Sequence, residues 1–271
     1  MTETAVPPGV GTRRRRSLRR RAVPPPPWLT RLLIVVGALG LWEWAARTER
    51  VDRLTVPPAS SVFAELDDIV TSDGFMMHVE RTAFEIVMAF GFGLVGGILL
   101  GVVFWKSRAV SEALEPFLVT LYAMPTLVFY PILLAMMGLN AGPIIVITVV
   151  FAIVPVAMNT MNALRSISPI LLHLAASLGM SSRQRVLKII LPAATPIAVP
   201  GVKLGFIYAV VGTIAMEFIL ANRGIGYMIN LTYGNFEVVD MFAYIVLVIA
   251  FAVASNSVMS AIERKIRRDM L

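Results

Sequence analysis

Residues 83–105, AFEIVMAFGFGLVGGILLGVVFW, decide the fold class of this chain. Glu85 is the one charged residue in the stretch. An α-helix needs about 20 mostly apolar residues to cross the hydrocarbon core of a bilayer. Backbone groups in lipid must bond internally, and the stretch lacks the alternation of a barrel strand. The stretch therefore predicts a membrane-spanning helix.

The overall composition leads to the same class. The chain has 271 residues, of which 57% are hydrophobic and 15% charged, and the net charge is +7. A soluble domain carries about 25% charged residues. With so few charged residues, the chain has too little polar surface to cover a water-soluble globule. An all-α integral membrane protein is therefore expected. The chain contains no cysteine, which excludes disulfides and thiolate chemistry.

The hydrophobic pattern divides the chain into spans and tails. Six stretches are long and apolar enough to span a membrane: Leu29–Ala46, Ala83–Trp105, Ala113–Gly138, Pro143–Leu164, Ile197–Leu220 and Met241–Ile262. Four parts are expected, namely a disordered basic cytoplasmic tail (1–27), a first span with an outer loop (28–82), a core of five helices (83–263) and a basic cytoplasmic tail (264–271).

Basic residues predict the orientation of these spans. With both termini in the cytoplasm, 19 of the 24 Lys and Arg residues lie inside and five lie outside. Cytoplasmic loops of membrane proteins carry such an excess. We therefore expect a multi-pass protein of the cell membrane with both termini inside. Basic runs also bind nucleic acid, but beside membrane spans they are better explained as flanks that touch anionic lipid, and no nucleic-acid partner is expected.

An inner loop, residues 168–192, reads SPILLHLAASLGMSSRQRVLKIILP. It predicts two short helices that meet at Gly179, because glycine accepts the left-handed backbone of a helix end. Pro169 suits the first turn of the first helix, and Ser181 or Ser182 can cap the second. Pro192 is expected to stop the second helix or to bend it toward the fifth span. The pattern alone fits a rigid knob that touches another protein as well as an interfacial helix on lipid.

The same loop resembles the "EAA" loop of ABC-type importer permeases, whose pattern is E-A-A-x3-G-x9-I-x-L-P. Ala175, Gly179, Ile189, Leu191 and Pro192 match the pattern, whereas His173 replaces the usual Glu and Leu174 the usual Ala. The resemblance implies a type I importer permease fold in which this loop is a cytoplasmic coupling helix that docks on the ATPase subunit. The coupling residues would be His173, Leu174, Ala175, Ala176, Ser177, Leu178, Gly179 and Met180.

Other segments resemble the nitrate/sulfonate/taurine branch of this family. They are Val56-Pro57-Pro58 with Ser61-Val62, His78 and Thr82 with Gly91, Gly93, Gly97 and Gly101, Met124-Pro125 with Tyr130-Pro131, and Glu217 with Gly224-Ile225-Gly226-Tyr227. The resemblance implies import of a small organic or inorganic anion. It also implies a second permease subunit, identical or related, two ATPase subunits that bind ATP and Mg, and an extracytoplasmic solute-binding protein.

Candidates for the translocation pathway are Met124, Pro125, Tyr130, Asn159 and Glu217. Carboxylates inside a membrane usually face protein or water. For Glu217 a structural hydrogen bond to the following Gly-rich loop is favoured over a pathway role. For Asn159 a bridge between helices is favoured over a pore-lining role. Gly93, Gly97 and Gly101 let helices approach closely, and packing within one subunit is favoured over contact with a second permease.

Several chemistries are excluded by the residues. His78 and His173 are the only histidines and fall on opposite sides of the membrane in this topology, so they cannot form one metal site. No G-x-x-x-x-G-K-[ST] phosphate loop is present. We therefore expect no catalytic residue and no cofactor on this chain, with ATP used by a separate chain. A transporter driven by an ion gradient and a membrane scaffold are the alternatives.

Overall fold

The computed structural model describes residues 26–48, 55–123 and 126–270. Within these ranges the chain forms helices and no strand. The helices are α1 (Pro27–Arg47), α2 (Ala59–Thr71), α3 (Phe75–Lys106), α4 (Arg108–Ala123), the 3-10 helix η1 (Thr126–Phe129), α5 (Tyr130–Met137), α6 (Ala141–Arg165), α7 (Pro169–Ser177), α8 (Ser182–Arg185), the π-helix η2 (Val186–Ile190), α9 (Leu191–Leu220), α10 (Ile225–Gly234) and α11 (Val238–Met270).

The chain divides into two units, Met1–Trp42 and Glu43–Leu271. In the first, α1 exposes a run of large apolar side chains that includes Leu33, Ile34 and Val36. Most of the tail predicted over residues 1–27 lies outside the described residues and stays a prediction. In the second unit, residues 264–270 continue α11 as helix.

Five of the six predicted spans fall within helices of the expected kind. The helices that are long and apolar enough to cross a membrane are Trp28–Arg47, Phe75–Lys106, Ala141–Arg165, Ser182–Gly234 and Val238–Arg268. The membrane class and the all-α fold therefore follow from helix length and hydropathy in the described ranges.

The stretch predicted as a span over Ala113–Gly138 is not one helix. It is divided among α4, η1 and α5, and Met124 and Pro125 lie outside the described residues. Pro116 lies inside α4, and Pro131 occupies the first turn of α5. Helix α4 continues through Pro116, whereas α5 begins beside Pro131, which suits a first turn because its missing N–H would have no helical partner there. Hydropathy averaged over the stretch does not register these interruptions.

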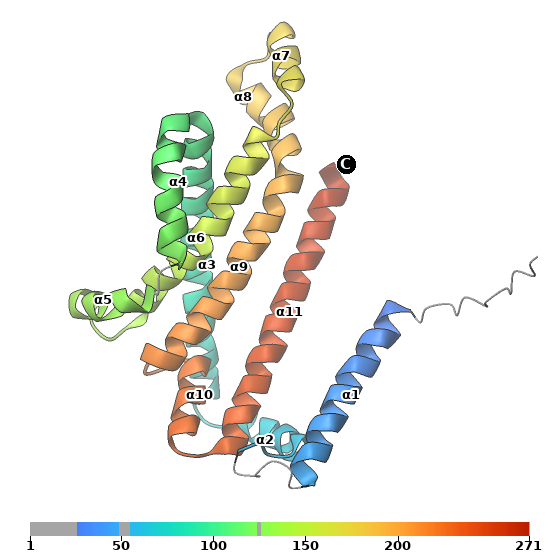
Figure 1. The fold of residues 1–271 in the computed structure, drawn as a ribbon, viewed down its shortest axis with the longest axis vertical. Coiled ribbons are helices and arrows are strands. Elements are labelled where there is room, and N and C mark those ends of the chain that lie inside the picture. The colour runs from blue at the N-terminus through green and yellow to red at the C-terminus, as the bar shows by residue number, and fades with distance from the viewer. Residues whose placement is uncertain (1–25, 49–54, 124–125, 271) are drawn as a thin grey trace, which may run out of the picture. The chain divides into compact units, whose positions relative to one another are not determined.

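The glycines of α3 allow it to pack closely on α6, as Figure 1 shows. A Cβ atom placed on Gly93 would lie 2.5 Å from Cβ of Ala152, and one on Gly97 would lie 2.6 Å from Cβ of Val156. Contacts this short do not occur between real Cβ atoms, so only glycine fits at this separation. The interpretation that this stripe packs helices within one subunit is confirmed.

A second glycine stripe, which the sequence analysis did not identify, lies on α9. Gly201 packs against the side chain of Asn159, and a Cβ on Gly205 would lie 2.6 Å from Cγ2 of Val156. Val156 is thus held between Gly97 of α3 and Gly205 of α9. Helix α6 is therefore the central element, with α3 and α9 on either side of it.

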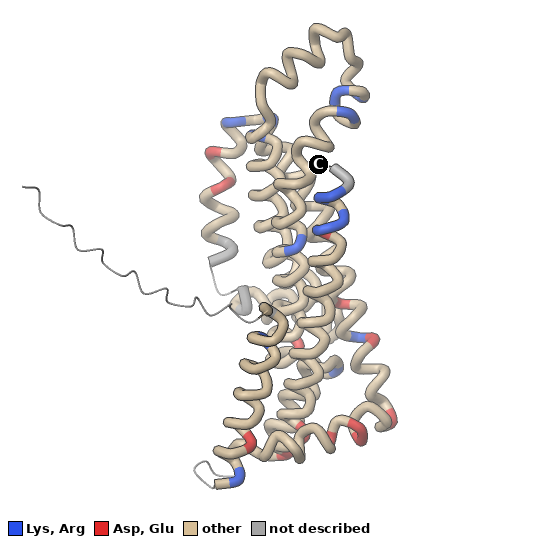
Figure 2. Tube along the Cα trace, turned by 90° about the vertical axis from the view of Figure 1, so that its right-hand side faces the viewer, with Lys and Arg blue, Asp and Glu red and all other residues tan. Residues whose placement is uncertain are grey.

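The two ends of the second unit differ in charge. At one end lie α7, α8 and the last residue of α3, Lys106; at the other lie α2 and α10. Figure 2 shows Lys and Arg gathered around α8 and the final turns of α11, and Asp and Glu along α2. Lys203 of α9 pairs with Glu263 of α11 at 3.4 Å between Nζ and Oε2.

Candidate coupling site and transport pathway

Residues 168–192, named the elbow here, form a sharp turn between α6 and α9. Pro169 occupies the first turn of α7, where the missing N–H costs nothing. The helix ends in two bonds, from the Met180 N–H to the Ala175 carbonyl (3.1 Å) and from the Gly179 N–H to the Ala176 carbonyl (3.0 Å). This is the Schellman pattern, which requires a left-handed residue. Gly179 supplies it with φ +64°.

The chain restarts as helix immediately after this turn. Ser181 is the N-cap of α8: its hydroxyl accepts the N–H of Gln184 at 3.3 Å, and the Gln184 side chain accepts the N–H of Ser181 at 2.9 Å. This reciprocal pair is a capping box, which satisfies two otherwise free donors. The predicted meeting of two helices at Gly179 is confirmed, and Ser181 rather than Ser182 is the cap. The turn is thus fixed by backbone bonds on both sides.

Helix α8 passes into α9 through a π-turn. The N–H of Leu191 bonds the carbonyl of Val186, five residues earlier. Pro192 follows at the start of α9. A proline ring clashes with the carbonyl four residues before it, and the wider π-turn gives that carbonyl room. Helical backbone continues from Ser182 to Leu220, so the expectation that Pro192 stops the helix is wrong. The alternative, a bend toward the fifth span, stays a prediction.

One face of α7 exposes large apolar side chains. Ile170, Leu174 and Leu178 recur every four residues, which places them on one side of a helix. Their exposed fractions are 76%, 51% and 67%. We call these three residues the elbow stripe. Exposed apolar patches of this kind mark contacts with protein or membrane.

The other predicted coupling residues occupy different positions on the elbow. His173, Ala176, Ser177 and Gly179 are exposed, and Met180 is half-buried. Ala175 is fully buried about 100° around α7 from Leu174, and α7 contacts the π-helix. Ala175 therefore holds α7 against the rest of the elbow, while the stripe faces outward.

At the other end of α9, the carboxylate of Glu217 is enclosed in a hydrogen-bond network. The Thr82 hydroxyl donates to Oε1 of Glu217 at 2.7 Å, and the N–H of Gly226 donates to Oε2 at 2.9 Å. The N–H of Ile225 donates to Oγ1 of Thr82 at 2.8 Å. We call Thr82, Glu217, Ile225 and Gly226 the Glu217 network. It joins α3, α9 and α10, and the favoured structural bond from Glu217 to the Gly-rich loop is confirmed.

Further polar contacts surround the Glu217 network. The N–H of Gly224 donates to Nδ1 of His78 at 3.0 Å, and the His78 ring stacks on Tyr227 with centroids 6.1 Å apart. One turn farther along α3, Arg81 pairs with the buried Glu85. Within the described residues, Oε2 of Glu85 has no hydrogen-bond partner. The loop after α9 is therefore held on α3 by the bonds from Gly224 to His78 and from Ile225 to Thr82.

Two of the described pathway candidates, Tyr130 and Asn159, contact distant parts of α9. Tyr130 donates from its hydroxyl to the Leu220 carbonyl at 2.9 Å, whereas Asn159 donates to the Pro155 carbonyl at 2.8 Å and packs on Gly201. Gly201 and Leu220 are roughly 28 Å apart along α9 at the α-helical rise. Met124 and Pro125 lie outside the described residues. A pathway role for these residues stays a prediction.

A family comparison matches residues 93–268 to the model described as "Binding-protein-dependent transport system inner membrane component". This range spans α6, the elbow and α9. The chain belongs to that family. The permease is thus a membrane component of binding-protein-dependent transport, which agrees with the resemblance carried by Gly179 and Pro192.

Individual relatives extend the comparison. The permease is 24% identical over 239 residues to a Bacillus subtilis (strain 168) protein provisionally named aliphatic sulfonates transport permease protein SsuC, covering 88% of this chain and 87% of the relative. It is 27% identical to the taurine transport system permease protein TauC of Escherichia coli (strain K12) over 208 residues, with 75% of each chain covered. These relatives are transport permeases rather than enzymes.

The fold is also that of a solved structure. An inward-facing conformation of the MetNI methionine ABC transporter superposes with a TM-score of 0.61 at 20% identity, covering 70% of the permease and 95% of the matched chain. The permease therefore has the fold of an ABC importer subunit. In its described residues no three His, Asp or Glu side chains are grouped as metal ligands.

Proposed function

We propose that the permease is one half of a dimer that forms a solute pathway and is driven by two ATPase subunits that bind ATP and Mg. It spans the membrane six times with both termini in the cytoplasm, and a binding protein delivers solute to the outer side. Five long apolar helices support this topology. The sixth span would be formed by α4, η1 and α5 together.

The elbow stripe is the observation that carries the proposed coupling. Ile170, Leu174 and Leu178 present apolar surface from a turn that Gly179 and the Ser181 capping box hold stiff. An interface gains affinity when an apolar anchor is already ordered before binding. A rigid elbow that continues directly into α9 also transmits displacement instead of absorbing it. Movement of the ATPase would in this way change the packing of the helix bundle between discrete states.

A binding assay tests the docking role. In the variant Leu174→Glu/Leu178→Glu, two carboxylates would be buried unpaired against the ATPase subunit. We expect affinity for that subunit to fall by roughly 100-fold or more, as judged by co-purification and by binding of purified ATPase. The matched variant Leu174→Met/Leu178→Met keeps the apolar volume and should retain binding. Equal ATPase binding by the Glu and Met variants would rule out the stripe as the docking surface.

The absence of cysteine makes the orientation directly testable. A single Ser177→Cys variant places a thiol on the exposed side of α7. We expect a membrane-impermeant maleimide to label it in inverted vesicles and not in intact cells. Labelling in intact cells would put the elbow on the outer face and exclude the proposal.

For the solute we propose a small anion of the sulfonate type. The named solutes of the two relatives, aliphatic sulfonates and taurine, support this class. The test is uptake of radiolabelled taurine or an alkyl sulfonate by proteoliposomes that contain the full transporter and its binding protein. Uptake should require internal ATP and persist with a protonophore. Uptake that a protonophore abolishes while ATP persists would favour the ion-gradient alternative.

A further inference from the structure

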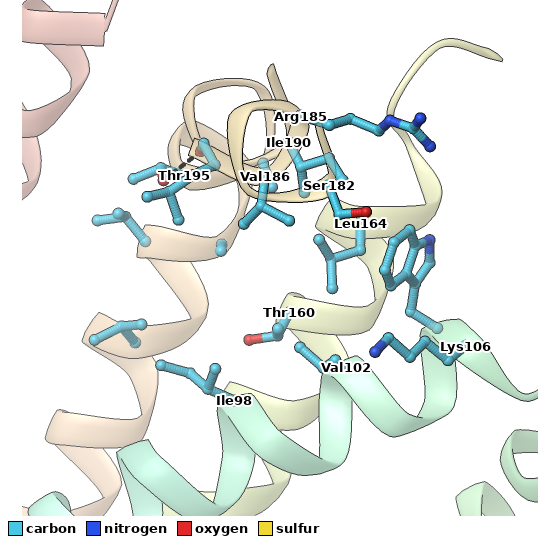
Figure 3. Close-up of a pocket in the computed structure, with 16 residues that line it drawn as sticks. Ile98, Val102, Lys106, Thr160, Leu164, Ser182, Arg185, Val186, Ile190 and Thr195 are labelled. Atoms are coloured by element: carbon cyan, nitrogen blue, oxygen red, sulfur yellow. Dashed lines mark hydrogen bonds between the residues drawn. The ribbon is translucent and has the colours of Figure 1, made fainter. Parts of the chain in front are cut away.

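A cavity of about 650 Å³ lies beneath the π-helix. Its walls come from α3, α6, the π-helix and α9, as Figure 3 shows. Apolar side chains dominate the lining, among them Ile98, Val102, Leu164 and Ile190. The volume falls within the range of about 300–1,000 Å³ that small-molecule sites occupy. The cavity is therefore large enough for an apolar ligand of substantial length.

Two cations stand on one side of this cavity. Lys106 comes from the end of α3 and Arg185 from α8, and in Figure 3 both lie toward the right-hand edge of the cavity, Arg185 above and Lys106 below. Nε of Arg185 is buried and has no hydrogen-bond partner among the described residues. None of the described lining residues is Asp or Glu. A buried donor without an acceptor, in a lining that holds a second cation, matches an anionic group.

The direction of the cavity fixes the shape of the ligand. Lys106 is the last residue of α3, and Ile98 lies eight residues earlier in the same helix. At the α-helical rise this separation is about 12 Å along the axis. The cavity therefore extends from the charged end of a membrane-spanning helix into its apolar part. Lys106 and the neighbouring Trp105 are the residue types that anchor helices at the headgroup level.

We propose that this cavity binds one acyl chain of an anionic phospholipid, with the lipid phosphate at Lys106 and Arg185. The apolar lining takes the chain, and the cations take the headgroup. The lipid comes from the leaflet on the elbow side, which is the cytoplasmic leaflet in the proposed topology. Binding itself needs neither ATP nor solute, so it can be tested separately from transport.

Removal of the two cations tests headgroup recognition. The transporter, purified with its partner subunits, is exchanged into nanodiscs that contain phosphatidylglycerol and phosphatidylcholine, and retained lipid is measured by native mass spectrometry. In Lys106→Gln/Arg185→Gln, phosphatidylglycerol should bind roughly 25-fold more weakly, at about fivefold per cation near a headgroup. The control Arg108→Gln/Arg183→Gln removes two exposed cations that do not line the cavity and should retain lipid as the parent does.

Two further variants test the apolar part and the other possible occupants. Ala198→Phe fills the cavity from α9 and should release the lipid, while phosphatidylcholine should not replace it in any variant. Ala198→Cys provides the only thiol of the chain and should not cross-link two permeases. Unchanged phosphatidylglycerol retention in the charge or filling variant would overturn the proposal. So would a cross-link at residue 198, which indicates a second copy, or displacement of the lipid by millimolar alkyl sulfonate, which indicates the transported solute.

Discussion

The elbow and the Glu217 network each depend on a glycine with positive φ, in opposite surroundings. Gly179 has φ +64°, and no atom lies within 4 Å of the place where a Cβ would be. Gly224 has φ +116°, and a Cβ there would meet the carboxylate of Glu217. The first glycine is required by backbone conformation alone. The second is required by backbone conformation and by lack of space.

This difference distinguishes the elbow, whose surface is exposed to a partner, from the Glu217 network, whose groups are bonded to other helices of the same chain. Around Gly179 the side chains of Leu174 and Leu178 point outward, and the bonds are local backbone bonds. Around Gly224 three of the bonds join residues more than 130 positions apart, as from Thr82 to Glu217. Substitutions near Gly224 should therefore affect folding, and those near Gly179 should affect coupling.

The largest effect is expected for Gly224→Ala. The added methyl group would clash with the Glu217 carboxylate, and alanine is strained at this positive φ. Together these two effects should lower the free energy of unfolding by about 4 kcal/mol. Gly234→Ala is the matched control, because nothing lies within 4 Å of its Cβ position. The measurement is the thermal midpoint of the purified permease by fluorescence-detected size exclusion. Equal midpoints for the two variants would show that the Gly224 end is as open as the elbow.

A second large effect is expected for Thr82→Val. The hydroxyl accepts from Ile225 and donates to Glu217, so its loss leaves two buried polar groups unpaired, at about 3 kcal/mol. Thr148→Val is the control, because Oγ1 of Thr148 is buried without a hydrogen-bond partner among the described residues. The control should be neutral or slightly stabilising in the same assay. A Thr82 variant as stable as the Thr148 variant would argue against a closed network.

Gly179→Ala should lower the stability less than the two preceding variants, but it should weaken the coupling between ATP hydrolysis and solute uptake more. Only the left-handed backbone is strained, which costs about 1 kcal/mol. The relaxed turn should redirect the elbow stripe, so solute uptake per ATP hydrolysed should fall while the permease remains folded. Gly179→Asn is the matched variant, since asparagine tolerates this backbone. If uptake per ATP is the same in the Ala variant as in the parent, the stiffness of the turn is not what transmits movement.

The smallest effect concerns Glu65 on α2, at the Glu217 end. Desolvation raises the pKa of the Glu65 carboxyl, and the charges of Asp240 and Asp68 raise it further. The folded chain then holds this proton more tightly than the unfolded chain, so stability falls as pH rises through the raised pKa. Glu65→Gln should gain a few tenths of a kcal/mol at pH 7 and flatten this part of the pH profile of the thermal midpoint. Ser61→Ala on the same helix should leave the pH profile unchanged.

The long helices and the elbow were accessible from the sequence because their signals are local. Hydropathy over residues 83–105 is enough for α3, and Pro169, Gly179 and Ser181 lie within one turn of the structures they determine. The family resemblance rested partly on the same loop, through Gly179 and Pro192. Local rules of helix capping apply without knowledge of the rest of the fold.

The remaining features depend on which helices meet. The spacing of Gly201 and Gly205 is visible in the sequence, but it does not identify α6 as the helix that packs there. The partners of Glu217 are Thr82, from another helix, and Gly226, beyond a turn. The stretch 113–138 was predicted as one span because average hydropathy gives no weight to a proline such as Pro131, beside which α5 begins.

The π-turn over Val186–Ile190 sets the direction in which the elbow faces. Each residue of an α-helix advances the chain by about 100° around its axis, so one extra residue within a turn rotates everything before it by that angle. Deleting one residue from this turn would leave every helix and every side chain of α7 intact and point the apolar face of α7 elsewhere. The number of residues in the π-turn therefore sets the rotation of the elbow about the α9 axis. Insertions and deletions in this turn are far harder to accommodate than substitutions.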